Sequence, residues 1–130
     1  MGKVEEKLAS LGYSLLQRNN LERSLWVKGE KTVRVVHSSE FKTIYVKSRY
    51  VRVLWKEEWK DYYAVIYDYS RGGGPTCILP VSVLFNFPFV KEKRKQVEYA
   101  KSGYWWSQRF PVNHEMTQFV LSYNERWDLI

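Results

Sequence analysis

From Tyr13 onward, the sequence is a succession of short runs rich in Val, Ile, Tyr and Trp, each ended by turn-forming residues. Such runs are typical of β-strands, and short turns between them favour antiparallel neighbours. The predicted strands are Tyr13–Arg18, Ser24–Lys28, Thr32–His37, Thr43–Trp55, Tyr62–Tyr69 and Thr76–Leu79. The pattern therefore predicts an antiparallel β-sheet of about four to six strands, arranged as a meander.

Helical patterns flank these strands. Val4, Leu8 and Leu11 have the spacing of one helix face, and Gly12 suits a helix C-terminus. Lys91–Ser102 consists mainly of strong helix formers and is followed by Gly103, which predicts a helix with a basic outer face.

Two further helical signals follow prolines or polar residues. Pro80 before VSVLF indicates either a helical turn or the edge of a strand. Asn113 is a plausible N-cap for a last helix, whose apolar stripe contains Met116, Phe119, Val120, Tyr123 and Trp127. Because no repeat or linker divides the chain, residues 1–130 are predicted to form a single α+β domain with an N-terminal helix and C-terminal helices.

Cysteine and histidine are too rare to build common metal or disulfide sites. The single cysteine, Cys77, permits no internal disulfide, and two histidines with one thiol form no recognisable zinc motif. The N-terminus has no apolar run long enough for a signal peptide or a membrane span. We therefore expect an intracellular, reducing, cytoplasmic location, with no membrane association, metal or cofactor.

Aromatic residues and positive charge are both abundant. The chain contains 22 Phe, Tyr and Trp residues and has a formal net charge of +7. Residues 42–60 and residues 91–109 each carry six Lys or Arg against two Glu. Aromatic faces stack unpaired bases and cations contact phosphates, so this combination predicts a single-stranded nucleic-acid partner. An ordinary solvated basic face is the alternative.

The predicted strand Thr43–Trp55 supplies the first candidate binding surface. Its apolar residues move from even to odd positions near residues 48–50, which predicts a bulge or bend and a concave sheet. In this hypothesis, the rings of Tyr45 and Trp55 stack bases, and three cations contact phosphates. These cations are Lys47, Arg49 and Arg52. An amphipathic strand without a ligand is the alternative.

The segment from Tyr104 to Pro111 supplies the second candidate surface, in a predicted connection between two helices. Adjacent Trp105 and Trp106 are not easily buried together on one side of an element, so we expect at least one of them to be available to a ligand. Arg109 adds a cation or a planar stacking group. Tryptophans that clamp a helix junction are the alternative.

Signals for catalysis are weaker. Glu40-Phe41-Lys42 could belong to a metal-dependent nuclease of the PD-(D/E)XK kind, but it falls at a predicted turn. Gly72-Gly73-Gly74 lacks the Lys-Ser/Thr of a phosphate-binding loop. The isolated His37 and His114 are expected to be structural. We therefore predict a non-catalytic protein and keep the nuclease as an alternative.

Five segments of the chain read IYVKSRYVRVLW, DYYAVIYDY, ILPVSVLF, GYWWSQRFPVNH and NERWDL. Together they resemble the ThermoDBP family of archaeal single-stranded DNA-binding proteins, and the resemblance covers about residues 3–129. It implies an antiparallel sheet flanked by helices, a cleft of aromatic and basic residues, little sequence preference and a role in genome maintenance. Single-stranded RNA stays open as the alternative ligand, because stacking and phosphate contacts do not distinguish the sugars.

The resemblance leaves the oligomeric state open. Proteins of this family can carry a C-terminal extension like a leucine zipper, which supports dimerisation. The present sequence ends at Trp127-Asp128-Leu129-Ile130 and shows no heptad tail. A homodimer formed in another way therefore stays an alternative to a monomer.

Overall fold

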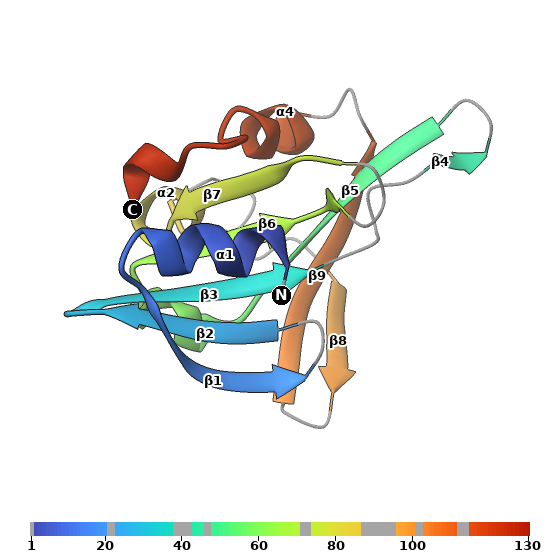
Figure 1. Cartoon of the computed structure of the whole chain (residues 1–130). Helices are drawn as coiled ribbons and strands as arrows, with labels where there is room; N and C mark the ends of the chain where they lie inside the picture. The colour runs from blue at the N-terminus through green and yellow to red at the C-terminus, as the bar shows by residue number, and fades with distance from the viewer. Residues whose placement is uncertain are drawn as a thin grey trace.

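A computed structural model describes the backbone of residues 2–20, 23–37, 43–45, 48–70, 74–86, 96–100, 103–111 and 115–130. These residues form an α+β fold with two sheets (Figure 1). The first sheet has the strand order β1-β2-β3-β6-β7, and the second has the order β4-β5-β9-β8. The predicted fold class, with an N-terminal helix and a helical C-terminal region, is confirmed.

The first sheet contains five of the predicted strands, with small shifts at their ends. Its strands are β1 (Ser14–Asn20), β2 (Arg23–Lys28), β3 (Lys31–His37), β6 (Ala64–Asp68) and β7 (Thr76–Pro80). All neighbours are antiparallel except β3 and β6, which run parallel with His37 opposite Asp68. The sheet is therefore mixed and is not a simple meander, because the chain builds part of the second sheet between β3 and β6.

The predicted long strand Thr43–Trp55 is two strands. β4 (Thr43–Tyr45) and β5 (Ser48–Trp55) are antiparallel, and Tyr45 pairs with Ser48. The prediction of one curved strand is therefore wrong, because the chain reverses where a bend was expected. β4 and the beginning of β5 project beyond the first sheet (Figure 1).

The predicted helix Lys91–Ser102 is also wrong over its described part. Residues Gln96–Ala100 form strand β8, and the expected connection after them is strand β9 (Gly103–Pro111). β8 and β9 are antiparallel, and Ala100 pairs with Gly103, the residue predicted to end a helix. Pairing with β9 therefore overrides the helix propensity of this stretch.

The predicted first helix and the turn after Pro80 are confirmed. α1 spans Lys3–Ser10, and Gly12 follows it with a φ of 93°, a conformation that suits glycine. α2 spans Val81–Leu84, and a 3₁₀ helix, η1, spans Glu57–Asp61. The last predicted helix is shorter than its apolar stripe: α4 spans Glu115–Leu121, and Trp127 begins a separate 3₁₀ helix, η3 (Trp127–Leu129). Asn113 lies outside the described residues.

Both faces of the first sheet carry a hydrophobic core, because its central strands alternate buried side chains. On one face, Ala64 and Ile66 pack with Val4 and Leu8 of α1, which lies across this sheet (Figure 1). On the other face, Val65 and Tyr67 belong to a second cluster. This second cluster also contains Trp55, Trp59, Leu84 and Val120, from β5, η1, α2 and α4. The cluster thus holds the end of β5 against the first sheet.

Candidate nucleic-acid interface

The second sheet joins the two segments that the sequence predicts to bind nucleic acid. β5 and β9 are antiparallel from Tyr50 opposite Pro111 to Trp55 opposite Trp106, without a break in register. β9 pairs on its other side with β8, where Glu98 lies opposite Trp105. The strand Ser48–Trp55 and the segment around Trp105 and Trp106 are therefore neighbours, as Figure 1 shows for β5 and β9.

The register divides the residues of the second sheet between two faces, because neighbours along a strand alternate and cross-strand partners share a face. One face carries Trp55 and the positions that share its phase. These are Val51 and Val53 in β5, Tyr104, Trp106, Gln108 and Phe110 in β9, and Val97 and Tyr99 in β8, with Arg49 at the beginning of β5. The mainly apolar composition of this set is what a core-facing surface requires.

The burial of Trp55 shows which face of the second sheet packs against the core. Its side chain has no exposed surface and lies in the hydrophobic cluster between the sheets. The hypothesis that Trp55 stacks a base is therefore wrong for this structure, because a buried ring offers no free face to a ligand. Trp106 is the cross-strand partner of Trp55 and belongs to the same face. Of the two adjacent tryptophans, Trp105 is the one on the opposite face.

The opposite face carries two of the predicted arginines, one from β5 and one from β9. Arg52 and Arg109 are direct cross-strand partners. Trp105 and Tyr50 share the phase of this pair, as does Glu98, the β8 partner of Trp105, so the face combines two cations and one anion with two aromatic residues. Like charges placed directly opposite one another destabilise an antiparallel pair, and a bound anion offsets that repulsion. This arrangement suits contacts to phosphates and bases.

The remaining predicted residues fall in different places. Tyr45 pairs with Ser48, but the register of β4 and β5 shifts between Thr43 and Tyr45, so this pairing does not assign Tyr45 to the face of Arg52. Arg49 has the phase of Trp55 and is not brought together with Arg52. Lys47 lies outside the described residues. The single curved strand on which the concave groove was expected is thus replaced by positions on two paired strands.

Tyr50 is a candidate that sequence reasoning did not select. It lies two residues before Arg52 on the same strand, and its β9 partner is Pro111. The signal was available in the alternation of Tyr50, Arg52 and Leu54, but only the β9 register shows that Arg109 and Trp105 share this face.

An exposed aromatic ring lies beside a cation at the first sheet. Tyr63 precedes β6 and is 41% exposed, and the Nζ atom of Lys31 lies 4.9 Å from the centre of its ring. This cation–π contact combines an aromatic ring with a cation, the two residue types that the face of Arg52 and Arg109 also carries. It provides an internal comparison for the face of Arg52 and Arg109.

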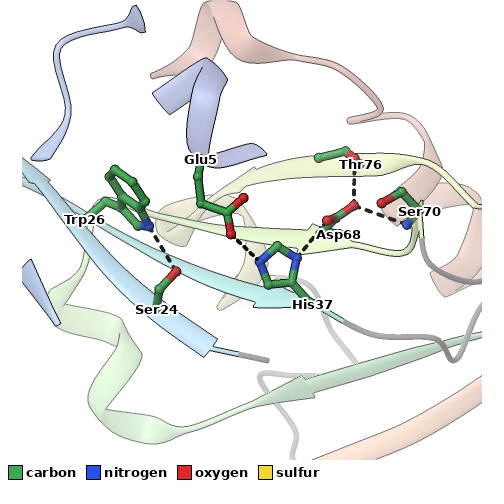
Figure 2. Close-up of polar contacts among 7 residues, drawn as sticks. All are labelled: Glu5, Ser24, Trp26, His37, Asp68, Ser70 and Thr76. Atoms are coloured by element: carbon green, nitrogen blue, oxygen red, sulfur yellow. Dashed lines mark hydrogen bonds and ion pairs between the residues drawn. The ribbon is translucent and has the colours of Figure 1, made fainter. Parts of the chain in front are cut away.

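A buried polar cluster joins α1 to the first sheet, as Figure 2 shows. His37 lies between two carboxylates: its Nδ1 is 2.7 Å from Asp68 Oδ2, and its Nε2 is 3.1 Å from Glu5 Oε1. Asp68 Oδ1 accepts hydrogen bonds from Thr76 Oγ1 and the Ser70 amide. Burial alone raises the pKa of Asp68, but the hydrogen bonds from His37, Ser70 and Thr76 outweigh it and lower the pKa to about 2.

The described residues offer no arrangement typical of nucleophilic or metal catalysis. No group of three His, Cys, Asp or Glu among them could hold a metal ion. Cys77 is buried, and burial, together with the charges of Glu125 and Asp68, raises the pKa of its thiol to about 12. Glu40 and Lys42, the candidate nuclease residues, lie outside the described residues, as do His114 and Gly72-Gly73.

Comparisons with known proteins add no relative. No family model, curated protein or solved structure matched the chain. Within the part of the chain that the structure describes, no helix is long and apolar enough to cross a membrane.

Proposed function

We propose that this chain binds single-stranded DNA on the face of the second sheet that carries Tyr50, Arg52, Trp105 and Arg109, and that it belongs to the ThermoDBP family. The observation that carries the proposal is the cross-strand pairing of Arg52 with Arg109. A sheet gains nothing from two opposed cations unless an anion lies near them. A phosphate of the DNA backbone supplies that anion.

Three further features support nucleic acid over a free anion. Trp105 and Tyr50 belong to the face of the arginine pair, and aromatic rings stack on unpaired bases without regard to sequence. The chain carries a formal net charge of +7, which attracts a polyanion from a distance. Stacked bases must be unpaired, so the combination favours a single strand over a duplex. In this proposal the protein is a non-catalytic DNA-binding protein of genome maintenance.

The test is binding of a labelled, unstructured DNA oligonucleotide, followed by fluorescence anisotropy at two salt concentrations. We expect salt-sensitive binding that is weaker for duplex DNA of the same sequence. The double variant Arg52→Gln/Arg109→Gln should lose most of this affinity, while Arg18→Gln, which removes an exposed cation from β1, should lose little. Near-ultraviolet circular dichroism establishes that each variant is folded.

The same titration distinguishes the competing ligands. An RNA oligonucleotide that binds more tightly than DNA would replace DNA by RNA as the ligand of this face. Equal affinity of the double variant and the wild type would show that the proposed face is not the binding surface. No binding of any oligonucleotide at low salt would overturn the nucleic-acid function itself.

A further inference from the structure

The buried cluster of Glu5, His37 and Asp68 is independent of the nucleic-acid face and has a property of its own. The three side chains come from α1, β3 and β6, and each residue is less than 9% exposed. Among the described residues, Glu5 and Asp68 are the ionisable groups that contact His37. The other charged residues of α1, Lys3, Glu6 and Lys7, are exposed, and β7 contributes the non-ionisable Thr76.

The two hydrogen bonds of His37 depend on its charge. A protonated imidazole has two N–H donors and can donate to both carboxylates, whereas a neutral ring has one donor and one lone pair. With a neutral ring, one carboxylate faces a lone pair and loses its donor. The docking of α1 through Glu5 is therefore sensitive to a single proton.

The geometry indicates which carboxylate loses its partner. Asp68 lies closer to His37 and retains donors from Ser70 and Thr76. Glu5 has only the longer contact, and its second oxygen, Oε2, is buried without a hydrogen-bond partner among the described residues. A neutral ring keeps its proton toward Asp68, and the bond to Glu5 is the one that breaks.

We propose that His37 is a proton-controlled latch that fastens α1 to the first sheet through Glu5. With His37 protonated, α1 is held by the ion pair and by its apolar residues. When the proton leaves, Glu5 is a buried carboxylate without a donor, and the first turns of α1 loosen. Val4 and Leu8 stay in the hydrophobic cluster, so α1 loosens without leaving the sheet. The second donor exists only while the ring carries both of its protons, so the latch is closed in the protonated form and open in the neutral form.

The experiment follows the proton and the helix in the same sample. Nitrogen-15 NMR of the imidazole rings reports the protonation of His37, and the variant His114→Gln, which removes the other of the two histidines, assigns the signal. Amide hydrogen exchange, corrected for its intrinsic dependence on pH, reports the protection of α1 from pH 5.5 to 9. We expect protection of α1 to fall on the order of tenfold over the pH range in which His37 loses its proton, because one charge-assisted hydrogen bond is lost.

Two variants separate the latch from a general loss of stability. In Glu5→Gln the acceptor of α1 carries no charge, so protection of α1 should be lower at pH 6 and nearly independent of pH, while β3 and β6 remain protected. His37→Asn should behave in the same way if it folds, and Glu5→Gln decides the question if it does not. The proposal is overturned if protection of α1 stays constant while His37 titrates, or if the wild-type pH dependence persists in Glu5→Gln.

Discussion

Arg52 of β5 is the direct cross-strand partner of Arg109 of β9, so the register sets two cations opposite each other on one face of the second sheet. If these two positions served only the stability of the sheet, an opposite charge or a neutral residue at one of them would be more favourable. Removing one arginine should therefore raise the stability of the fold and lower the affinity for DNA. These opposite effects distinguish a binding role of the pair from a structural one.

Replacing either arginine by glutamine should weaken DNA binding and leave the fold intact. Each of Arg52→Gln and Arg109→Gln removes one phosphate contact, which should lower the slope of log affinity against log salt by about 0.7 for a single strand. The free energy of unfolding should rise by about 0.2 to 1 kcal/mol, because the repulsion is removed. Anisotropy titrations at several salt concentrations measure the slope, and urea unfolding measures the stability.

The matched control for these variants is Arg18→Gln. Arg18 is an exposed cation on β1, in the other sheet, and its loss changes the net charge of the protein equally. If it reduces the salt slope as much as Arg52→Gln does, the effect is one of net charge and the paired arginines have no special role.

The two tryptophans on opposite faces should respond differently to truncation. Trp105→Ala should cost about 1 to 3 kcal/mol of DNA-binding free energy with little change in salt slope, as expected for loss of a stacking ring. Trp55→Ala should destabilise the fold by about 3 to 5 kcal/mol, because it leaves a cavity in a fully buried cluster. Binding titrations and urea unfolding of both variants measure the two effects.

Tyr63→Ala is the control for an exposed ring. Tyr63 lies beside Lys31 on the first sheet, so its removal should leave the affinity for DNA unchanged. A larger loss of affinity in Tyr63→Ala than in Trp105→Ala would move the binding surface from the second sheet to the first.

Local sequence patterns predict most of the first sheet but not the second. Strands β1, β2, β3, β6 and β7 have runs of apolar and β-branched residues with turn residues between them, and both signals are local. The reversal between β4 and β5 lacks such a signal, because Tyr45-Val46-Lys47-Ser48 contains no Gly, Pro, Asn or Asp. The apolar residues change from even to odd positions near residues 48–50, but a bend and a chain reversal both produce such a change.

The composition of the candidate site was predictable, but its geometry was not. The strong helix formers of KEKRKQVEYAKS gave no indication that Gln96–Ala100 would pair with β9. The same pairing decides that Trp105 and Trp106 lie on opposite faces and that Arg52 meets Arg109. Such register is a long-range property, because the partners are 57 residues apart in the sequence.

Stability at acid pH should depend on Asp68. Its pKa in the folded protein, about 2, is lower than the ordinary value of 3.8, so its contribution is full above about pH 4 and is lost as the pH falls through 2. Asp68→Asn should cost about 1 to 3 kcal/mol at pH 7. It should also flatten the decline of stability between pH 4 and pH 2, measured by urea unfolding at each pH.

Asp128→Asn is the matched control for this acid dependence. Asp128 forms an ion pair with Arg126 at 3.0 Å, but both side chains are exposed. Exposed pairs contribute little to folding, so this variant should leave the free energy of unfolding at pH 7 nearly unchanged. An equal loss of stability in Asp68→Asn and Asp128→Asn would show that the buried hydrogen bonds of Asp68 stabilise the fold no more than an exposed ion pair does.

The thiol of Cys77 should be unreactive in the folded protein. It lies in β7 with no exposed surface, and burial, reinforced by the negative charges of Glu125 and Asp68, raises its pKa to about 12. A thiol reagent at pH 8 should therefore label Cys77 only when the protein opens, and the labelling rate should increase with urea in parallel with unfolding. Mass spectrometry of samples quenched at intervals measures this rate. Rapid labelling without urea, at the rate of a free thiol, would contradict the burial of Cys77 against Tyr67 and Tyr69 in the cluster between the sheets.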